Sequence, residues 1–208
     1  MQTNVSATKA NLMAIRRSLE LAQTGYDLMD RKRNILIREM MGLIDTAKRL
    51  QNQIDITFRT AYESLKTANI TMGLSNVAEI AQSIPEEDKI KIRFRSVMGV
   101  EVPVVKLREE HPTLPYELST TNSALDAAYM NFMRVKNFTV TLAEVENSIY
   151  KLASAIKKTQ KRANALRNII IPRFEETVKN ITDALDEKDR EEFSRMKIIK
   201  RQKDQADY

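Results

Sequence analysis

The sequence contains no cysteine, which excludes disulfides and thiolate metal sites. It has no tryptophan, and aromatic residues make up only 6 % of its 208 residues, less than a compact core usually carries. Only four glycines and five prolines are present, so turns should be few and elements long. No apolar run approaches the roughly 18 residues of a membrane-spanning helix, and the N-terminus lacks the apolar segment of a signal peptide. We expect a cytoplasmic chain that reaches a membrane only through partners.

Catalytic motifs are also missing. The four glycines are widely separated, so none forms the clustered loop that brings backbone N–H groups to a phosphate. His111, the single histidine, stands beside a proline in an expected loop and is interpreted as a surface residue. We therefore predict no catalytic residue, no bound cofactor and no metal site, and a chain that is not an enzyme.

Apolar residues recur in steps of three and four from Leu12 onward, which indicates a coiled-coil helix. With Leu12 at heptad position a, the a positions are Leu12, Leu19, Tyr26, Arg33, Met40, Ala47, Ile54, Ala61 and Ala68. The d positions are Ile15, Ala22, Met29, Leu36, Leu43, Leu50, Thr57 and Ser64. Ser6 or Thr8 is suited to cap the start of this helix.

A second series with the same spacing runs through the C-terminal half of the chain. Its a positions are Val135, Leu142, Ile149, Ile156, Ala163 and Ile170, and its d positions are Phe138, Val145, Leu152, Thr159 and Leu166. The series resumes after Pro172 at Phe174, a four-residue step from Ile170 that predicts a stutter in the supercoil. We expect the helix to continue through Pro172, with a bend there.

The two series predict one antiparallel pair, because long helices with a narrow seam need a partner and each has the other. The expected organisation is a mostly α, elongated single domain: an N-terminal coiled-coil helix over residues 1–81, a middle insert over residues 82–122 and a C-terminal coiled-coil helix over residues 123–208. A parallel dimer through each seam is the alternative. Placing Ala68 near Ala128 gives a register estimate, and an error of one heptad in it would still leave the basic runs of the two helices overlapping.

The insert has a different pattern. Residues 90–95 alternate apolar and basic side chains, and residues 100–104 are β-branched around Pro103. These two runs predict a β-hairpin within residues 90–107, with its turn at Met98 and Gly99 and with Pro103 on an edge strand. The remaining prolines of the insert predict an extended loop at residues 111–115.

Two residues in the stretch TGYDLMDRKRNIL, residues 24–36, depart from the helical pattern. Gly25 falls at position g, where a missing side chain allows close packing or a slight bend. Arg33 occupies an a position, where its stem can follow the seam while its guanidinium reaches solvent. A single polar a residue can also fix the register of a coiled coil.

Basic residues gather where the register estimate places residues 31–38 opposite residues 158–165. No acidic residue occurs between Glu146 and Glu175, which hold seven basic residues between them. The resulting surface, called the basic collar, comprises Arg31, Lys32, Arg33, Arg38, Lys158, Lys161 and Arg162. Like charges at one level repel, so an acidic partner is one interpretation and a solvated face the other.

Four groups of residues resemble the D subunit of V-type and archaeal A-type rotary ATPases. They are Thr8–Leu12, Gly25–Arg33, Met98–Pro103 and Lys158–Glu175, in the family's order and across most of the chain. The chain has Leu28-Met29-Asp30 where the family usually has Leu-Leu-Lys. The resemblance implies a central-stalk rotor shaft that carries torque between an ATP-hydrolysing or ATP-synthesising hexamer and ion translocation in the membrane.

The resemblance also implies the partners. These are the alternating catalytic and non-catalytic subunits of the hexamer, the F subunit, and the subunit that seats the shaft on the membrane rotor ring. The chain would then be cytoplasmic and peripheral to the membrane, with no insertion into it. The competing interpretations are a generic coiled-coil scaffold or adaptor and a basic nucleic-acid binder; the second lacks stacking aromatics and a recognition module.

Overall fold

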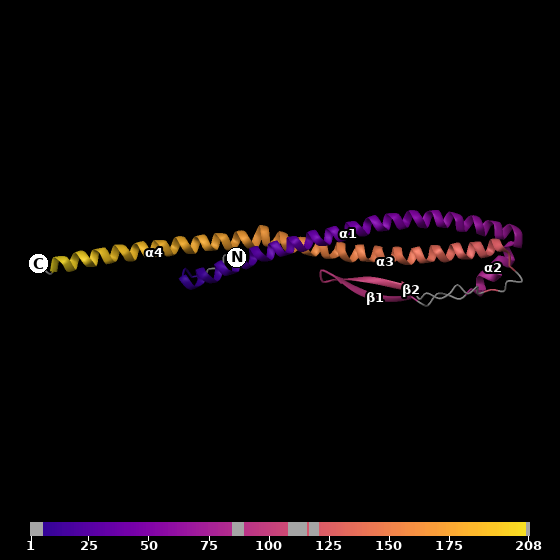
Figure 1. Cartoon of the computed structure of the whole chain (residues 1–208). Helices are drawn as coiled ribbons and strands as arrows, with labels where there is room; N and C mark the ends of the chain where they lie inside the picture. Colours follow the sequence, from indigo (N-terminus) through magenta and orange to yellow (C-terminus); the bar gives the residue numbers. More distant parts are fainter. Residues whose placement is uncertain (1–5, 85–89, 108–115, 117–120, 207–208) are drawn as a thin grey trace. The chain divides into compact units, whose positions relative to one another are not determined.

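The computed structural model describes residues 6–84, 90–107, 116 and 121–206. The elements follow one another as α1 (Lys9–Met72), α2 (Leu74–Ser83), β1 (Ile90–Val97), β2 (Val100–Leu107), α3 (Ser123–Ala165), the π-helical turn η2 (Leu166–Ile170) and α4 (Ile171–Ala206) (Figure 1). The predicted fold class, two long helical segments that flank a small antiparallel hairpin, is confirmed. Residues 111–115, the expected extended loop, lie outside the described residues.

The chain forms two compact units, and each takes part of both long helical segments. The first unit comprises Met1–Arg33 and Lys157–Tyr208, and the second comprises Asn34–Ile156. In the second unit Ser64 accepts a hydrogen bond from Asn131, and the ring of Tyr62 meets that of Phe132 edge to face. Further along α1, Thr71 accepts a hydrogen bond from Asn122, the residue that precedes α3. The two helices of this unit are therefore antiparallel, and the register lies within the one heptad of the sequence estimate.

The heptad positions of α1 are its inward face. Every a and d position of α1 is buried or half-buried. The buried apolar residues of α1 are Ala22, Leu36, Ala47, Ile54, Ala61 and Ala68, and all six are a or d positions. Five buried residues of α3, namely Val135, Val145, Leu152, Thr159 and Ala163, likewise occupy the predicted seam, whereas the buried Ser148 lies beside it. Four of the six buried positions of α1 are alanines, so much of the seam consists of small side chains.

The ends of α1 are set by local chemistry. At its start, the Asn11 backbone N–H donates to Thr8 Oγ1 at 3.3 Å, so Thr8 rather than Ser6 caps the helix. At its end, Gly73 has φ 87° and ψ 146°, a conformation open almost only to glycine, and α2 starts at the next residue. The single helix expected over residues 1–81 is therefore divided at Gly73. In α2, Val77 packs with Ala68 of α1 and Leu125 of α3.

The hairpin has the predicted turn residues. Val97 pairs with Val100, and Met98 and Gly99 between them have φ 50° and 77°, the two positive values of a type I′ turn. The register then runs to Ile90 opposite Leu107. β2 attaches the hairpin to the helices, because Val102 is buried in one cluster with Leu36 of α1 and Leu152 of α3.

The C-terminal helical segment continues through Pro172, as expected, but the seam adjusts through a π turn in place of the predicted stutter. The predicted four-residue step from Ile170 to Phe174 is wrong, since Ile170 is 37 % exposed and Ile171 takes the inward position. The seam steps five residues, from Leu166 to Ile171, and the π turn η2 spans this step with a bond from the Ile171 N–H to the Leu166 carbonyl. A π turn takes one extra residue, and it widens the helix where the proline ring would otherwise meet the carbonyl four residues earlier.

Candidate partner-binding surface

The residues of the basic collar divide between the two units. Arg31, Lys32 and Arg33 of α1 and Lys158, Lys161 and Arg162 of α3 belong to the first unit, whereas Arg38 belongs to the second. In the first unit a hydrogen bond between Arg33 and Gln160 sets the two runs at one level, as the register estimate predicted. Arg31, Arg38, Lys158, Lys161 and Arg162 are exposed, and Lys32 is half-buried. Five of the seven side chains are therefore open to a partner.

Arg33 faces the other helix rather than a partner. Its Nη1 donates to Gln160 Oε1 at 2.9 Å, and its Nη2 lies 2.6 Å from Asp30 Oδ1 one helical turn earlier. Gln160 in turn donates through Nε2 to Asn164 Oδ1 at 2.9 Å. The expectation that the guanidinium reaches solvent is thus corrected: it joins a polar network between the helices. Sequence reasoning did not identify Asp30 and Gln160 as partners of Arg33. A polar residue at an a position needs hydrogen-bonding partners, and that requirement could have indicated them.

The C-terminal run of basic residues covers the outer faces of the helix. Lys151, Lys157, Lys158, Lys161, Arg162, Arg167 and Arg173 are all exposed. Lys157 and Lys161 are four residues apart and share one helix face, and Lys158 and Arg162 share the neighbouring face, so the charge forms a broad outward band on α3 in the first unit. Such a distribution gives a positive potential over a broad surface, which can attract an acidic protein surface from several directions.

Gly25 has room beside it. A Cβ built on Gly25 would stand 4.0 Å from Leu166 Cδ1, an ordinary van der Waals separation, and it would meet no other atom within 4 Å. Pro172 is exposed and is the second residue of α4, directly after η2. Both residues therefore lie at the part of the first unit where the seam takes its five-residue step.

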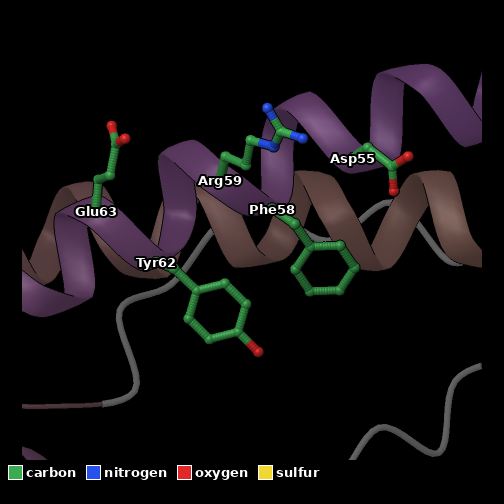
Figure 2. Close-up of a pocket in the computed structure, with 5 residues that line it drawn as sticks. All are labelled: Asp55, Phe58, Arg59, Tyr62 and Glu63. Atoms are coloured by element: carbon green, nitrogen blue, oxygen red, sulfur yellow. The ribbon is translucent and has the colours of Figure 1, made fainter.

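A shallow depression lies on the surface of α1 in the second unit. It is lined by Asp55, Phe58, Arg59, Tyr62 and Glu63. Figure 2 shows Phe58 and Tyr62 extending from the same side of the helix, with their ring centroids 5.9 Å apart in a stacked arrangement. The lining holds no nucleophile beside a base, and all five residues come from one helix. It is an open surface with mixed charge rather than an enclosed site.

Among the residues that the structure describes, no three histidine, cysteine, aspartate or glutamate side chains gather as a metal site would require. His111 lies outside the described residues. Within the same described ranges, no helix has both the length and the apolar character needed to cross a bilayer.

Known proteins are similar to this chain over most of its length. The sequence model of the family of ATP synthase D subunits matches residues 11–201. The chain is 47 % identical over 197 residues to the V-type ATP synthase D subunit of Thermotoga neapolitana, and the match covers 95 % of this chain and 97 % of that protein. It is 36 % identical over 199 residues to the A-type ATP synthase D subunit of Thermococcus sibiricus, covering 94 % of this chain and 93 % of the relative. The A-type ATP synthase D subunit of Pyrococcus furiosus gives the same identity and coverage. The chain therefore belongs to the family of ATP synthase D subunits.

Proposed function

We propose that this chain is the central rotor shaft of a V-type or A-type rotary ATPase. The observation that carries the proposal is the family match over residues 11–201, which includes both long helical segments and the hairpin between them. In this role the chain does no chemistry of its own. It transmits torque between the nucleotide-hydrolysing or nucleotide-synthesising hexamer and the rotor in the membrane, and it stays peripheral to the membrane on the cytoplasmic side.

The pairing of the helices supports this role. Torque passes along a helix pair only if the helices do not slide past each other. In the first unit the bond from Arg33 to Gln160 opposes sliding, and in the second unit the bond from Asn131 to Ser64 does so. Buried alanines in the seam let the two backbones approach closely, which gives a narrow pair suited to the axis of a ring of subunits.

The partners follow from the proposal. The two ends of the chain, residues 1–19 and 185–208, enter the hexamer of alternating catalytic and non-catalytic subunits. Exposed apolar side chains near the end of α4, among them Phe193, Met196 and Ile199, are available for that contact. The F subunit binds the side of the shaft, and a further subunit seats the shaft on the membrane ring. The basic collar provides an electrostatic contact with one of these partners.

Reconstitution tests the proposed role. The hexamer and the membrane sector should pump ions on ATP hydrolysis when this chain is present and should fail to couple the two when it is left out. Pumping retained without the chain would contradict the proposal, and so would ATP hydrolysis by the chain alone. Sedimentation of the isolated chain separates the role from that of a coiled-coil scaffold, which would form a homodimer through its seams.

A charge reversal tests the collar. Changing Arg31, Lys32, Lys161 and Arg162 together to glutamate should weaken assembly by about tenfold or more, since like charges then face the acidic partner. The matched control reverses four exposed basic residues of the second unit, Lys48, Arg49, Lys66 and Arg134, with the same change in net charge. Wild-type assembly should also weaken as salt rises above about 0.1 M. If the two variants weaken assembly equally at low and at high salt, the proposed contact through the basic collar is wrong.

A further inference from the structure

Strand β1 is exposed along its length. All of its residues except Val97 are exposed, and Val97 is half-buried. Three large apolar side chains on one face of the strand are open to solvent: Ile90 is 45 % exposed, Ile92 59 % and Phe94 67 %. A two-stranded hairpin has only marginal stability in water. The exposed apolar face of β1 therefore does not serve the hairpin itself and indicates contact with another segment.

The hairpin is attached to the helices mainly through β2, and in β1 Val97, beside the turn, packs against the same cluster. Val102 of β2 is only 2 % exposed and packs with Leu36 and Leu152. The backbone N–H of Val105 donates to Glu144 Oε2 of α3 at 2.7 Å. In Figure 1 the hairpin lies alongside α3 within the second unit. These contacts hold β2 and the turn end of β1 in place and leave residues 90–96 of β1 on the outer side of the hairpin.

Among the described residues no strand pairs with the outer backbone edge of β1, here called its free edge. In an antiparallel pair, directly opposed residues point their N–H and C=O groups either toward each other or both away. Val105 points its N–H away from β1, toward Glu144, so its partner Ile92 points away from β2. By alternation, Ile90 and Phe94 do the same. Among the described residues the sheet has two strands, so these groups face outward from the sheet.

The other face of β1 is basic. Lys91, Arg93 and Arg95 are exposed and stand opposite Lys106, Val104 and Val102, respectively, so no acidic side chain balances them within the hairpin face. Glu101, the acidic residue of β2, lies opposite Ser96 on the apolar face. A second copy of β1 is a poor occupant of the edge, because pairing two such strands would bring basic residues together.

We propose that β1 accepts an extended segment of a partner protein as a third strand, and that this segment alternates apolar and acidic residues. Its apolar side chains cover Ile90, Ile92 and Phe94, and its carboxylates lie beside Lys91, Arg93 and Arg95 on the opposite face. Its backbone bonds the outward N–H and C=O groups of the free edge, as in other strand additions. The inference rests on the hairpin alone and does not depend on the rotary role.

Synthetic peptides test the proposal on the full-length chain. The probe is the capped heptapeptide Val-Glu-Val-Glu-Val-Glu-Val, and its lysine counterpart replaces each glutamate. We expect the glutamate peptide to bind about tenfold more tightly or better, from three favourable cross-strand charge pairs. A third peptide with the same composition in blocks should bind no better than the lysine peptide. Equal binding of the three peptides, or no binding, would overturn the proposal.

Backbone methylation separates strand addition from contact through side chains only. Peptides N-methylated at alternate residues block one edge or the other, so one methylated peptide should keep its affinity and the other should lose it. Saturation with the unmodified peptide should slow amide exchange at Ile90, Ile92 and Phe94 more than at Lys91 and Arg93, whose amides already face β2. If both methylated peptides bind alike, or if the outward amides exchange at an unchanged rate, strand addition is wrong.

A charge swap provides the matched variant. Lys91→Glu, Arg93→Glu and Arg95→Glu together should reverse the preference, so that the lysine peptide binds more tightly than the glutamate peptide. The control variant carries Lys48→Glu, Arg49→Glu and Lys66→Glu, three exposed positions of α1 with the same total charge change, and should keep the original preference. Glutamate preference retained in the β1 variant would contradict the proposal, and the methylated peptides test it on the unmodified chain.

Discussion

Arg33 of α1 donates a 2.9 Å hydrogen bond to Gln160 of α3 from a heptad position that is otherwise apolar. The pair selects one register. A slip of one heptad would set Arg33 opposite Ala153, whose side chain offers no acceptor, or opposite Arg167, which repels it. A polar side chain in the seam thus costs some hydrophobic burial and excludes the nearest wrong alignments of the helices.

The Arg33–Gln160 pair should show a measurable coupling. Arg33→Ala and Gln160→Ala, alone and together, should give a coupling of about 1 kcal/mol in the free energy of unfolding, since one partner is charged and the site is half-buried. Denaturant unfolding of the four proteins measures it. Arg31→Ala, on an exposed neighbour, should change stability by less than about 0.5 kcal/mol. Strictly additive single changes would show that the bond contributes nothing to the pairing.

Gly25→Ala should stabilise the chain by about 1 kcal/mol, the difference in helix propensity between the two residues. The added Cβ meets only Leu166 Cδ1, at 4.0 Å, so no clash offsets this gain. Gly73→Ala is the contrasting variant, and it should destabilise by about 2 kcal/mol because Gly73 has φ 87°. Thermal unfolding compares the two. Destabilisation by Gly25→Ala would mean that α1 uses a bend at this point.

Removing one residue at the π turn should be tolerated. Deletion of Asn168 restores a regular three-four spacing from Leu166 onward, and Pro172→Ala supplies the backbone N–H that a continuous α-helix needs. We expect this double variant to unfold within about 1 kcal/mol of Pro172→Ala alone.

Deleting Asn180 in place of Asn168, again with Pro172→Ala, should cost about 3 kcal/mol. This deletion turns the buried Ile181 and the half-buried Leu185 out of the seam. Denaturant midpoints compare the two deletions. If both deletions cost the same, the π turn does not serve to keep the seam in phase.

Tyr116 should make stability fall at alkaline pH. Its hydroxyl donates to Asp126 Oδ1 at 2.8 Å, and burial, with that carboxylate beside it, raises the pKa of Tyr116 above its ordinary value of 10.0. Because the pKa of Tyr116 is higher in the folded chain than in the unfolded chain, its neutral hydroxyl contributes fully to the free energy of unfolding below the unfolded pKa. That contribution is lost as pH rises above about 10. Tyr116→Phe should cost about 1 kcal/mol at neutral pH.

Unfolding of wild type and Tyr116→Phe between pH 8 and pH 11 measures this effect. The stability difference between the two should stay constant up to about pH 10 and then shrink. A difference that does not change over the whole range would show that the hydroxyl keeps no special environment in the folded chain.

The sequence predicted the elements that repeat. Heptad spacing identified the inward faces of both long segments, because burial of a narrow stripe leaves a periodic record in the residue types. The hairpin was predictable for the same reason, with its period of two and with Gly99 at the turn. The register estimate was close because small residues such as Ala68 and Ala128 are favoured where backbones approach.

Single irregularities were harder to predict. Three consecutive isoleucines, at 169, 170 and 171, are equally apolar, so composition alone could not tell which one faces inward. The break at Gly73 was hidden because Val77 and Ile80 continue an apolar spacing into α2. Arg33 was recognised as unusual, but its partner Gln160 is 127 residues away and became evident only once the register was known.

The small residues of the seam have a consequence for which changes the chain can accept. Ala61 and Ala68 are completely buried, and Ala128 and Ala163 are nearly so. Replacing one of these alanines with glycine removes only a methyl group and leaves almost no cavity. In most cores the damaging substitutions are those that replace a large side chain with a small one and so create a cavity. Enlargement is the harmful direction here, because an isoleucine or leucine at any of these sites would force two backbones apart. Substitutions in this family should therefore be limited at these sites by the space between helices, and much less by the amount of apolar surface that a residue brings.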